Sequence, residues 1–207
     1  ISQLPSPISD HMTPMTLSDY WIQLLNQLLK SGVEIYDPTG DYLEMTMVPV
    51  EVSQFDSDKL SAWVPQKNIE EMKKVFLGGG ESAFGHSYHD LIINSGQFDQ
   101  ALERLRSKRS SKKAVIVLGM ITGKEWVPCV NVIHFWVREN DLCLNYYARG
   151  QDVWLKFVPD LLALRELQHR FARELDSALS LGPVKGVVAS AHLYFHDREA
   201  ASNMIHT

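Results

Sequence analysis

The chain has 207 residues, 45% of them apolar and 22% charged, so no class of disordered protein fits it and one domain with a sizeable core is expected. Its formal charge of −5 excludes duplex nucleic-acid binding, which needs a dominant basic face. No apolar run reaches the roughly 18 residues of a membrane span, and no export signal is recognisable. Two cysteines outside any CxxC pair indicate a reducing compartment, so we expect a cytoplasmic protein.

The N-terminal quarter begins with a segment that we exclude from the fold. Residues 1–12 are rich in proline and serine and lack an initiating methionine, so we expect a disordered or vector-derived leader before one domain over 13–207. The apolar spacing of residues 16–29 predicts a helix. A turn and an alternating run then predict one or two strands up to Val52, followed by a loop over 53–68.

The rest of the chain alternates between helical periodicity and apolar strand patterns. The predicted elements are a helix over 68–80, a helix over 96–113, strands over 114–120, 127–137 and 141–150, a helix that follows Pro159 and ends near Gly182, and a strand over 184–196. The second and third of these strands are expected to form a hairpin. This order of elements indicates an α+β domain.

The stretch from Val127 to Asp160 is the most informative about function. Its segments "VPCVNVIHFWV" and "LCLNYYARGQDVWLKFVPD" resemble the thymidylate synthase superfamily signature, PCH…QFYV followed by L…YQRS.D..LG.PFN. In that family an arginine, an aspartate and an asparagine follow the nucleophilic cysteine by 20, 23 and 31 residues. The same offsets from Cys129 reach Arg149, Asp152 and Asp160 without a gap.

Two further segments extend the resemblance over roughly residues 70–198. "FDQALERLRSKRSSKK" is similar to a family helix that precedes a basic pair, which puts Lys112 and Lys113 at the phosphate-binding positions. "SAHLYFH" is similar to the family's DAH.Y.NH, which puts His192 and Tyr194 at the ribose. The resemblance implies a thymidylate-synthase-like sheet with packed helices. It also implies a homodimer through the sheet face, in which the basic pair reaches the partner's active site.

The resemblance makes Cys129 the candidate nucleophile. Carbon 5 of a pyrimidine becomes nucleophilic after a thiolate adds at carbon 6, and a thiol needs a nearby cation or dipole to lower its pKa. Arg149, expected on the neighbouring strand, is the candidate cation. The alternative for a lone cysteine is a small buried hydrophobe in a strand, and we keep that interpretation for Cys143.

A nucleotide phosphate needs two or three cationic groups, which Arg149, Lys112 and Lys113 offer. The two lysines stand where the family has arginines. The alternative for the run "RSKRSSKK" is a solvated helix end whose cations favour the helix dipole.

Asp160 is the most informative departure from the family pattern. The family's asparagine matches uracil, whereas a protonated carboxyl, or a carboxylate facing a protonated N3, matches cytosine. The cytidylate hydroxymethylases of the superfamily carry aspartate here, so the resemblance points to a cytosine nucleotide. The alternative is that Asp160 caps the helix that follows Pro159.

Other parts of the family's site are less complete. Glu70 or Glu71 is the candidate proton relay, with surface helix carboxylates as the alternative. Phe84 stands where the family has a tyrosine, Val130 replaces a histidine, and no segment after His196 matches the one that closes over the folate. His86 and His89 have metal-ligand spacing without further ligands nearby, so we expect no metal site.

The combined prediction is a hydroxymethyltransferase that acts on CMP or dCMP. Its implied one-carbon donor is 5,10-methylenetetrahydrofolate, with Asp152 helping to hold the ring. Two alternatives stay open: a methylase acting on dUMP or dCMP, and a non-catalytic nucleotide-binding homologue. The expected partners are a small nucleotide monophosphate and a second copy of the chain, with no nucleic-acid polymer and no membrane.

Overall fold

The computed structural model describes residues 15–79, 87–119 and 127–206. The expectations for the leader, Phe84 and His86 lie outside these residues. The described strands are β1 (Val33–Ile35), β2 (Tyr42–Val52), β3 (Val115–Val117), β4 (Val130–Arg138), β5 (Asp141–Ala148), β6 (Gln151–Asp152) and β7 (Ser180–Tyr194). The described helices are α1 (Leu17–Ser31), α2 (Ser57–Leu60), α3 (Gln66–Lys73), η1 (Lys74–Gly78), η2 (Asp90–Asn94), α4 (Gln97–Ser107), α5 (Phe157–Leu175), η3 (Phe195–Asp197) and α6 (Arg198–Ile205).

The described strands form one mixed sheet of seven strands. Its order is β1-β2-β7-β5-β4-β3, and β6 pairs with β7 beside this path. Most neighbours are antiparallel, but β7 runs parallel to β5 and β6 because α5 connects β5 to β7 as a crossover. The predicted hairpin between β4 and β5 is confirmed, with Glu139 at φ 53° in its two-residue turn.

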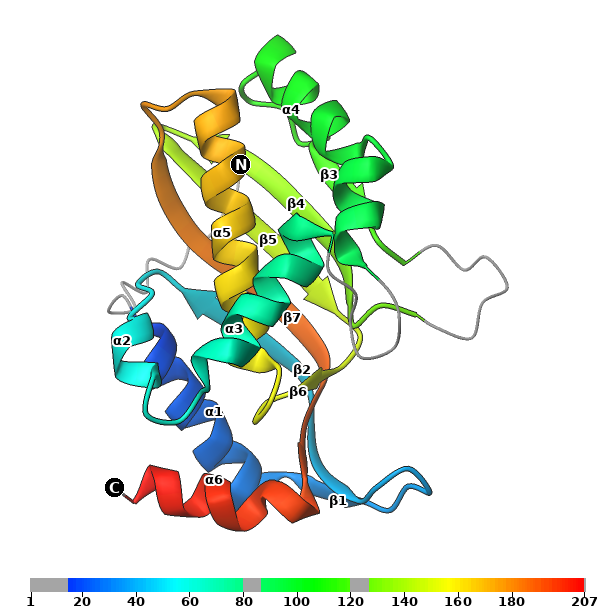
Figure 1. Cartoon of the computed structure of the whole chain (residues 1–207), viewed down its shortest axis with the longest axis vertical. Coiled ribbons are helices and arrows are strands. Elements are labelled where there is room, and N and C mark those ends of the chain that lie inside the picture. The colour runs from blue at the N-terminus through cyan, green and yellow to red at the C-terminus, as the bar shows by residue number, and fades with distance from the viewer. Residues whose placement is uncertain (1–14, 80–86, 120–126, 207) are drawn as a thin grey trace, which may run out of the picture.

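The helices α3, α4 and α5 lie over one face of the sheet, as Figure 1 shows, and the core fills the space between them. Phe135 of β4 stacks on Phe171 of α5 with ring centroids 3.9 Å apart, and Phe98 of α4 meets Phe171 edge-on at 5.3 Å. Burying these rings together with the aliphatic side chains around them contributes favourable free energy that joins the layers. This packing fixes α5, whose first turn reaches the candidate site.

Most predicted helices are confirmed, although α4 ends at Ser107 and not at residue 113. Thr16 caps α1 by accepting a hydrogen bond from the Asp19 N–H at 3.1 Å, and Gly79 in the left-handed conformation ends η1. The expected end of the long helix near Gly182 is wrong. The helix α5 stops at Leu175, because the chain from Ser180 onward joins the sheet as β7.

The sequence patterns missed the short elements. The expected loop 53–68 contains α2 and the start of α3, and β1, β6 and α6 had no sufficient periodicity to be predicted. The α+β class is confirmed, whereas the thymidylate-synthase-like fold and the dimer stay predictions. Within the described ranges, no helix combines the length and the apolar character needed to cross a bilayer.

Candidate functional site

Backbone pairing brings several predicted site residues to one end of the sheet. The Arg149 N–H donates to the Cys129 carbonyl at 2.9 Å, where β4 begins and β5 has just ended. Asp152 of β6 is the register partner of His192 of β7, and the Val153 N–H donates to the His192 carbonyl at 2.8 Å. The strands therefore bring residues from three segments, distant in sequence, to the same end of the sheet.

Arg149 also supports the segment that precedes the cysteine. Its Nη2 donates to the Val127 carbonyl at 2.8 Å and its Nε to the Pro128 carbonyl at 3.1 Å. The residue is still exposed, so its guanidinium can meet an anion from solvent. Arg149 thus ties the start of β4 to the end of β5 while remaining accessible.

Cys129 is exposed, so it is not the small buried hydrophobe of the alternative interpretation, whereas Cys143 is buried. Protein atoms around the Cys129 sulfur nevertheless desolvate it, and this desolvation raises the pKa of the thiol above its ordinary value. The charge of Asp160 raises this pKa further, and the nearby cations Arg149 and Lys156 lower it. Arg149 therefore lowers the pKa of the Cys129 thiol, as predicted, but desolvation outweighs it, and the low thiol pKa predicted from the sequence is not found.

Asp160 lies in the first turn of α5 and is 4% exposed. Burial raises its pKa from 3.8 to about 7, against a hydrogen bond from Gln151 and the positive charge of Lys156. Gln151 Nε2 donates to Asp160 Oδ2 at 3.1 Å. The helix begins at Phe157, so the alternative that Asp160 caps this helix is wrong.

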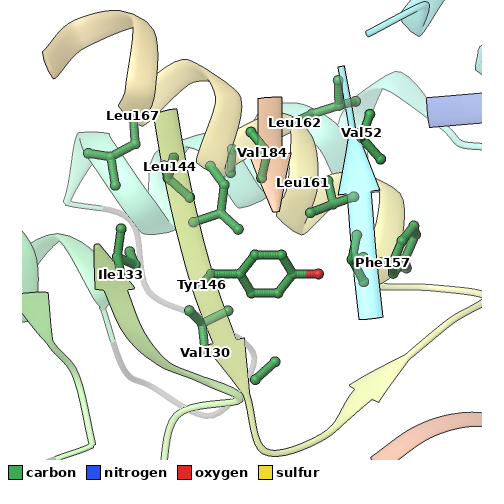
Figure 2. Packing of buried hydrophobic residues seen from close by; sticks show 14 of the residues in the cluster. Val52, Val130, Ile133, Leu144, Tyr146, Phe157, Leu161, Leu162, Leu167 and Val184 are labelled. Carbon is green, nitrogen blue, oxygen red and sulfur yellow. The ribbon is translucent and has the colours of Figure 1, made fainter. Parts of the chain in front are cut away.

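Two buried tyrosines accompany Asp160. The Tyr88 hydroxyl accepts the Val130 N–H at 3.2 Å and its ring stacks on Phe76 with centroids 4.3 Å apart. Figure 2 shows the Tyr146 side chain among apolar residues, and no described residue accepts or donates a hydrogen bond at its buried hydroxyl. Burial raises the pKa of both phenols, and the charge of Asp160 adds to this effect. Asp160 therefore lies near hydroxyl groups that stay protonated.

His192 and Tyr194 form one wall of the site together with Tyr42. The three rings contact each other pairwise, with centroids 5.4 to 5.9 Å apart. Burial lowers the pKa of His192 below its ordinary value, so the imidazole is neutral at pH 7. Its Nδ1 lies 3.3 Å from the Ser190 carbonyl, which leaves Nε2 for another partner.

Asp152 and Lys156 flank the turn that leads into α5. Asp152 Oδ1 accepts the N–H groups of Trp154 and Leu155, both at 3.0 Å, so this carboxylate shapes the turn. Lys156 is exposed at the start of α5, and its charge lowers the pKa of both Cys129 and Asp160. The motif spacing did not indicate Lys156, because the family pattern has no cation there.

The predicted basic pair does not join this end of the sheet. Lys112 and Lys113 are exposed and precede Ala114, whose carbonyl accepts the Phe135 N–H at 2.9 Å. Phe135 is six residues beyond Cys129, a separation of about 20 Å along a strand. A surface hollow of ≈ 560 Å³ lies at this far end, lined by Lys108, Arg109, Ser110, Lys112, Val137, Arg138 and Glu139.

Glu70 and Glu71 lie on an exposed face of α3. Glu70 pairs with Lys73 at 3.4 Å, and Glu71 pairs with Lys67 at 3.6 Å. These pairs match the alternative of surface helix carboxylates, and the structure does not bring the glutamates among the charges that act most on Cys129. Among the described residues, no three acidic, histidine or cysteine side chains gather so that they could hold a metal ion.

The sequence patterns overlooked Gln151, Tyr88 and Tyr146. Gln151 lies inside the quoted motif, and a glutamine between Gly150 and Asp152 was the available signal. The two tyrosines had no signal that separates them from core residues.

No family model matches the chain. Curated relatives named "Putative thymidylate synthase" are similar to it over nearly its whole length. The protein from Methanosarcina barkeri is 24% identical over 201 residues, which cover 92% of each chain. The protein from Methanothermobacter thermautotrophicus is 24% identical over 91% of this chain and 95% of its own, and that from Methanosarcina mazei is 25% identical over 91% of each. These similarities support a relationship to the thymidylate synthase superfamily.

Proposed function

We propose, from this relationship, that the chain is a one-carbon transferase of the thymidylate synthase type that hydroxymethylates carbon 5 of CMP or dCMP. The coarser assignment, a thymidylate-synthase-like transferase, is supported by the names of the archaeal relatives. The finer assignment to cytosine is supported by Asp160. A buried carboxyl with a pKa of about 7 offers a hydrogen-bond donor and an acceptor near neutral pH, which cytosine N3 and its 4-amino group require.

In this proposal each residue has a defined task. The Cys129 sulfur adds to carbon 6, which makes carbon 5 nucleophilic toward the one-carbon unit. Once carbon 5 carries the one-carbon unit, it loses its proton and the bond from that unit to the donor nitrogen breaks, which leaves an exocyclic methylene and frees tetrahydrofolate. Water then adds to the methylene, and the Cys129 thiolate leaves carbon 6 as the 5,6 double bond forms again. Asp160 contacts the base, Arg149 the phosphate, and His192 and Tyr194 the sugar. Glu70 and Glu71 stay candidates for the proton relay only if α3 moves.

The implied donor is 5,10-methylenetetrahydrofolate, which supplies the one-carbon unit when bound. The site fits a reduced folate in one respect, because the half-buried Asp152 offers a carboxylate and a pterin ring carries N–H groups that need acceptors. Asp152 would therefore hold the pterin ring. Its charge already acts on the His192 and Tyr194 side chains.

A homodimer is part of the proposal, because Lys112 and Lys113 can reach a phosphate near Cys129 only from a second chain. The sheet face that lies opposite α5 supports this arrangement. It carries the exposed apolar side chains of Val117 and Tyr147, which are 45% and 40% exposed and flank Val132 of β4 in the register. We expect Tyr147→Lys, on the same face, to convert a dimer into monomers in analytical ultracentrifugation. A monomeric wild-type protein would contradict the dimer.

Release of tritium from carbon 5 of labelled CMP, dCMP and dUMP tests the reaction, with and without methylenetetrahydrofolate. We expect release from a cytosine nucleotide by the wild type and none by Cys129→Ala. Release only from dUMP would replace this proposal with a methylase. No release from any of the three nucleotides would rule out the proposed activity.

The raised pKa of the Cys129 thiol favours a second candidate, a nucleotide-binding homologue without catalysis. This candidate predicts that a pyrimidine monophosphate binds, that carbon 5 does not exchange its hydrogen with solvent, and that Cys129→Ala leaves binding intact.

A further inference from the structure

Gln151 is a buried amide in the candidate site to which the proposed reaction gives no task. It is 1% exposed, and its Nε2 donates to Asp160 Oδ2 at 3.1 Å. Its Oε1 is buried and finds no hydrogen-bond partner in the described parts of the chain. Leaving such an acceptor unpaired costs free energy, so the donated bond to Asp160 is the polar interaction that this side chain provides.

The backbone holds Gln151 in one place. It pairs with Ala191 of β7, and the next residues are fixed by the Val153 N–H bond to His192 and by the turn at Asp152. A side chain that starts from such a fixed strand and is fully buried has little rotamer freedom. The amide is therefore held with its N–H directed at Asp160 Oδ2.

That bond distinguishes the two oxygens of Asp160. Oδ2 accepts from Gln151, and a carboxyl oxygen that already accepts an N–H is the less favourable site for the proton, although its second lone pair can still accept from a ligand. A single proton on this carboxyl then lies on Oδ1. The carboxyl thus presents a donor and an acceptor in a fixed order, whereas a carboxyl without such a neighbour can exchange the two.

We propose that Gln151 is the positioning residue that sets base selectivity, because it fixes which Asp160 oxygen donates and which accepts. Cytosine presents an acceptor at N3 and a donor at its 4-amino group, and uracil presents the reverse order. A carboxyl of fixed order pairs with one base and leaves two polar groups unpaired against the other. This inference rests on the proposed function, in which Asp160 contacts the base.

The test compares nucleotide binding by wild type and Gln151→Met, a substitution that keeps the volume and removes the donor. Calorimetric titration with CMP, UMP, dCMP and dUMP, without folate, gives the cytosine-to-uracil affinity ratio. We expect this ratio to fall about tenfold in Gln151→Met, because the carboxyl can then match either base. We also expect the pH at which binding changes to move upward, because the lost bond favoured the charged form of Asp160.

Gln168→Met is the matched control. Gln168 is a buried glutamine on α5, about two turns beyond Asp160. Its Nε2 donates to the Leu142 carbonyl at 2.7 Å. It should lose stability in thermal unfolding and keep the wild-type affinity ratio. If Gln151→Met does not fold, Gln151→Asn retains an amide that is too short to reach Asp160, and the same loss of selectivity is expected.

The outcomes separate this inference from the proposed function. A wild type that prefers cytosine nucleotides and a Gln151→Met variant that does not would support both. A preference that survives in Gln151→Met and Gln151→Asn would overturn the role of Gln151 and leave the proposed function standing. A wild type that binds none of the four nucleotides, or binds them without preference, would overturn the cytosine assignment and this inference with it.

Discussion

The two ends of α5 carry aspartates in opposite environments. Asp160 in the first turn is buried, and burial raises its pKa to about 7. Asp176 at the C-terminal cap is only partly buried, with a side chain that is 41% exposed, and the Ala178 N–H at 3.0 Å and Arg109 Nη2 at 2.8 Å lower its pKa below the ordinary value. One helix thus holds a carboxyl that readily keeps its proton and a carboxyl that readily loses it. The difference shows that desolvation dominates where few donors reach a carboxyl.

The largest expected effect is on stability and comes from Asp160→Asn. Because the pKa of Asp160 is about 7 in the folded protein and near 3.8 in the unfolded chain, ionisation destabilises the folded state as pH rises. At pH near 8 the variant should be more stable than wild type, by on the order of 2–4 kcal/mol. Near pH 4 the two should be equal. Urea unfolding at both pH values measures this, and a difference that does not grow with pH would contradict it.

The second effect is on the reactivity of Cys129. The charge of Asp160 raises the pKa of this thiol, so Asp160→Asn should increase the fraction of thiolate. We expect alkylation by iodoacetamide at pH near 8 to become about threefold faster. Mass spectrometry distinguishes Cys129 from the buried Cys143. Asp176→Asn is the control, and a similar acceleration there would show that the charge of Asp160 is not the cause.

The smallest effect should come from Asp176→Asn itself. A lowered folded-state pKa contributes stability above the unfolded pKa, and this contribution is lost as pH falls. The variant should therefore melt at a slightly lower temperature than wild type at pH 7, and the difference should shrink in high salt because the bond to Arg109 is exposed. If Asp176→Asn melted at a higher temperature than wild type, the ionised Asp176 would destabilise the folded protein, and the contrast drawn between Asp160 and Asp176 would be wrong.

Long elements with a regular apolar spacing were predictable from the sequence. The helix that became α1 and the hairpin of β4 and β5 need only local periodicity and turn residues. Pro159 misled the boundary of α5, because proline is accepted within the first turn of a helix and does not have to precede it. The short strand β6 forms only because β7 lies beside it, and no local pattern reports that neighbour.

The candidate site was predictable where the resemblance supplied spacing and not where burial decides. The offsets named Cys129, Arg149 and Asp152, and backbone pairing brings them to one end of the sheet. The protonation of Asp160 and its bond to Gln151 depend on the surroundings in three dimensions. Spacing alone could not reveal either, because an aspartate near a helix start has the same sequence signature whether it is buried or exposed.

The long strand β7 has a consequence for how the protein acquires its site. It pairs with β2 in a register that places Tyr194 opposite Tyr42, so this pairing closes a loop that contains most of the chain. The strand β7 also carries His192. Closing so large a loop is entropically costly, and chains that depend on such distant pairings fold slowly. The helices can form before this strand docks, but the candidate site around Cys129 cannot, because His192 and Tyr194 belong to β7. Ligand binding during refolding should therefore lag behind the recovery of helical signal.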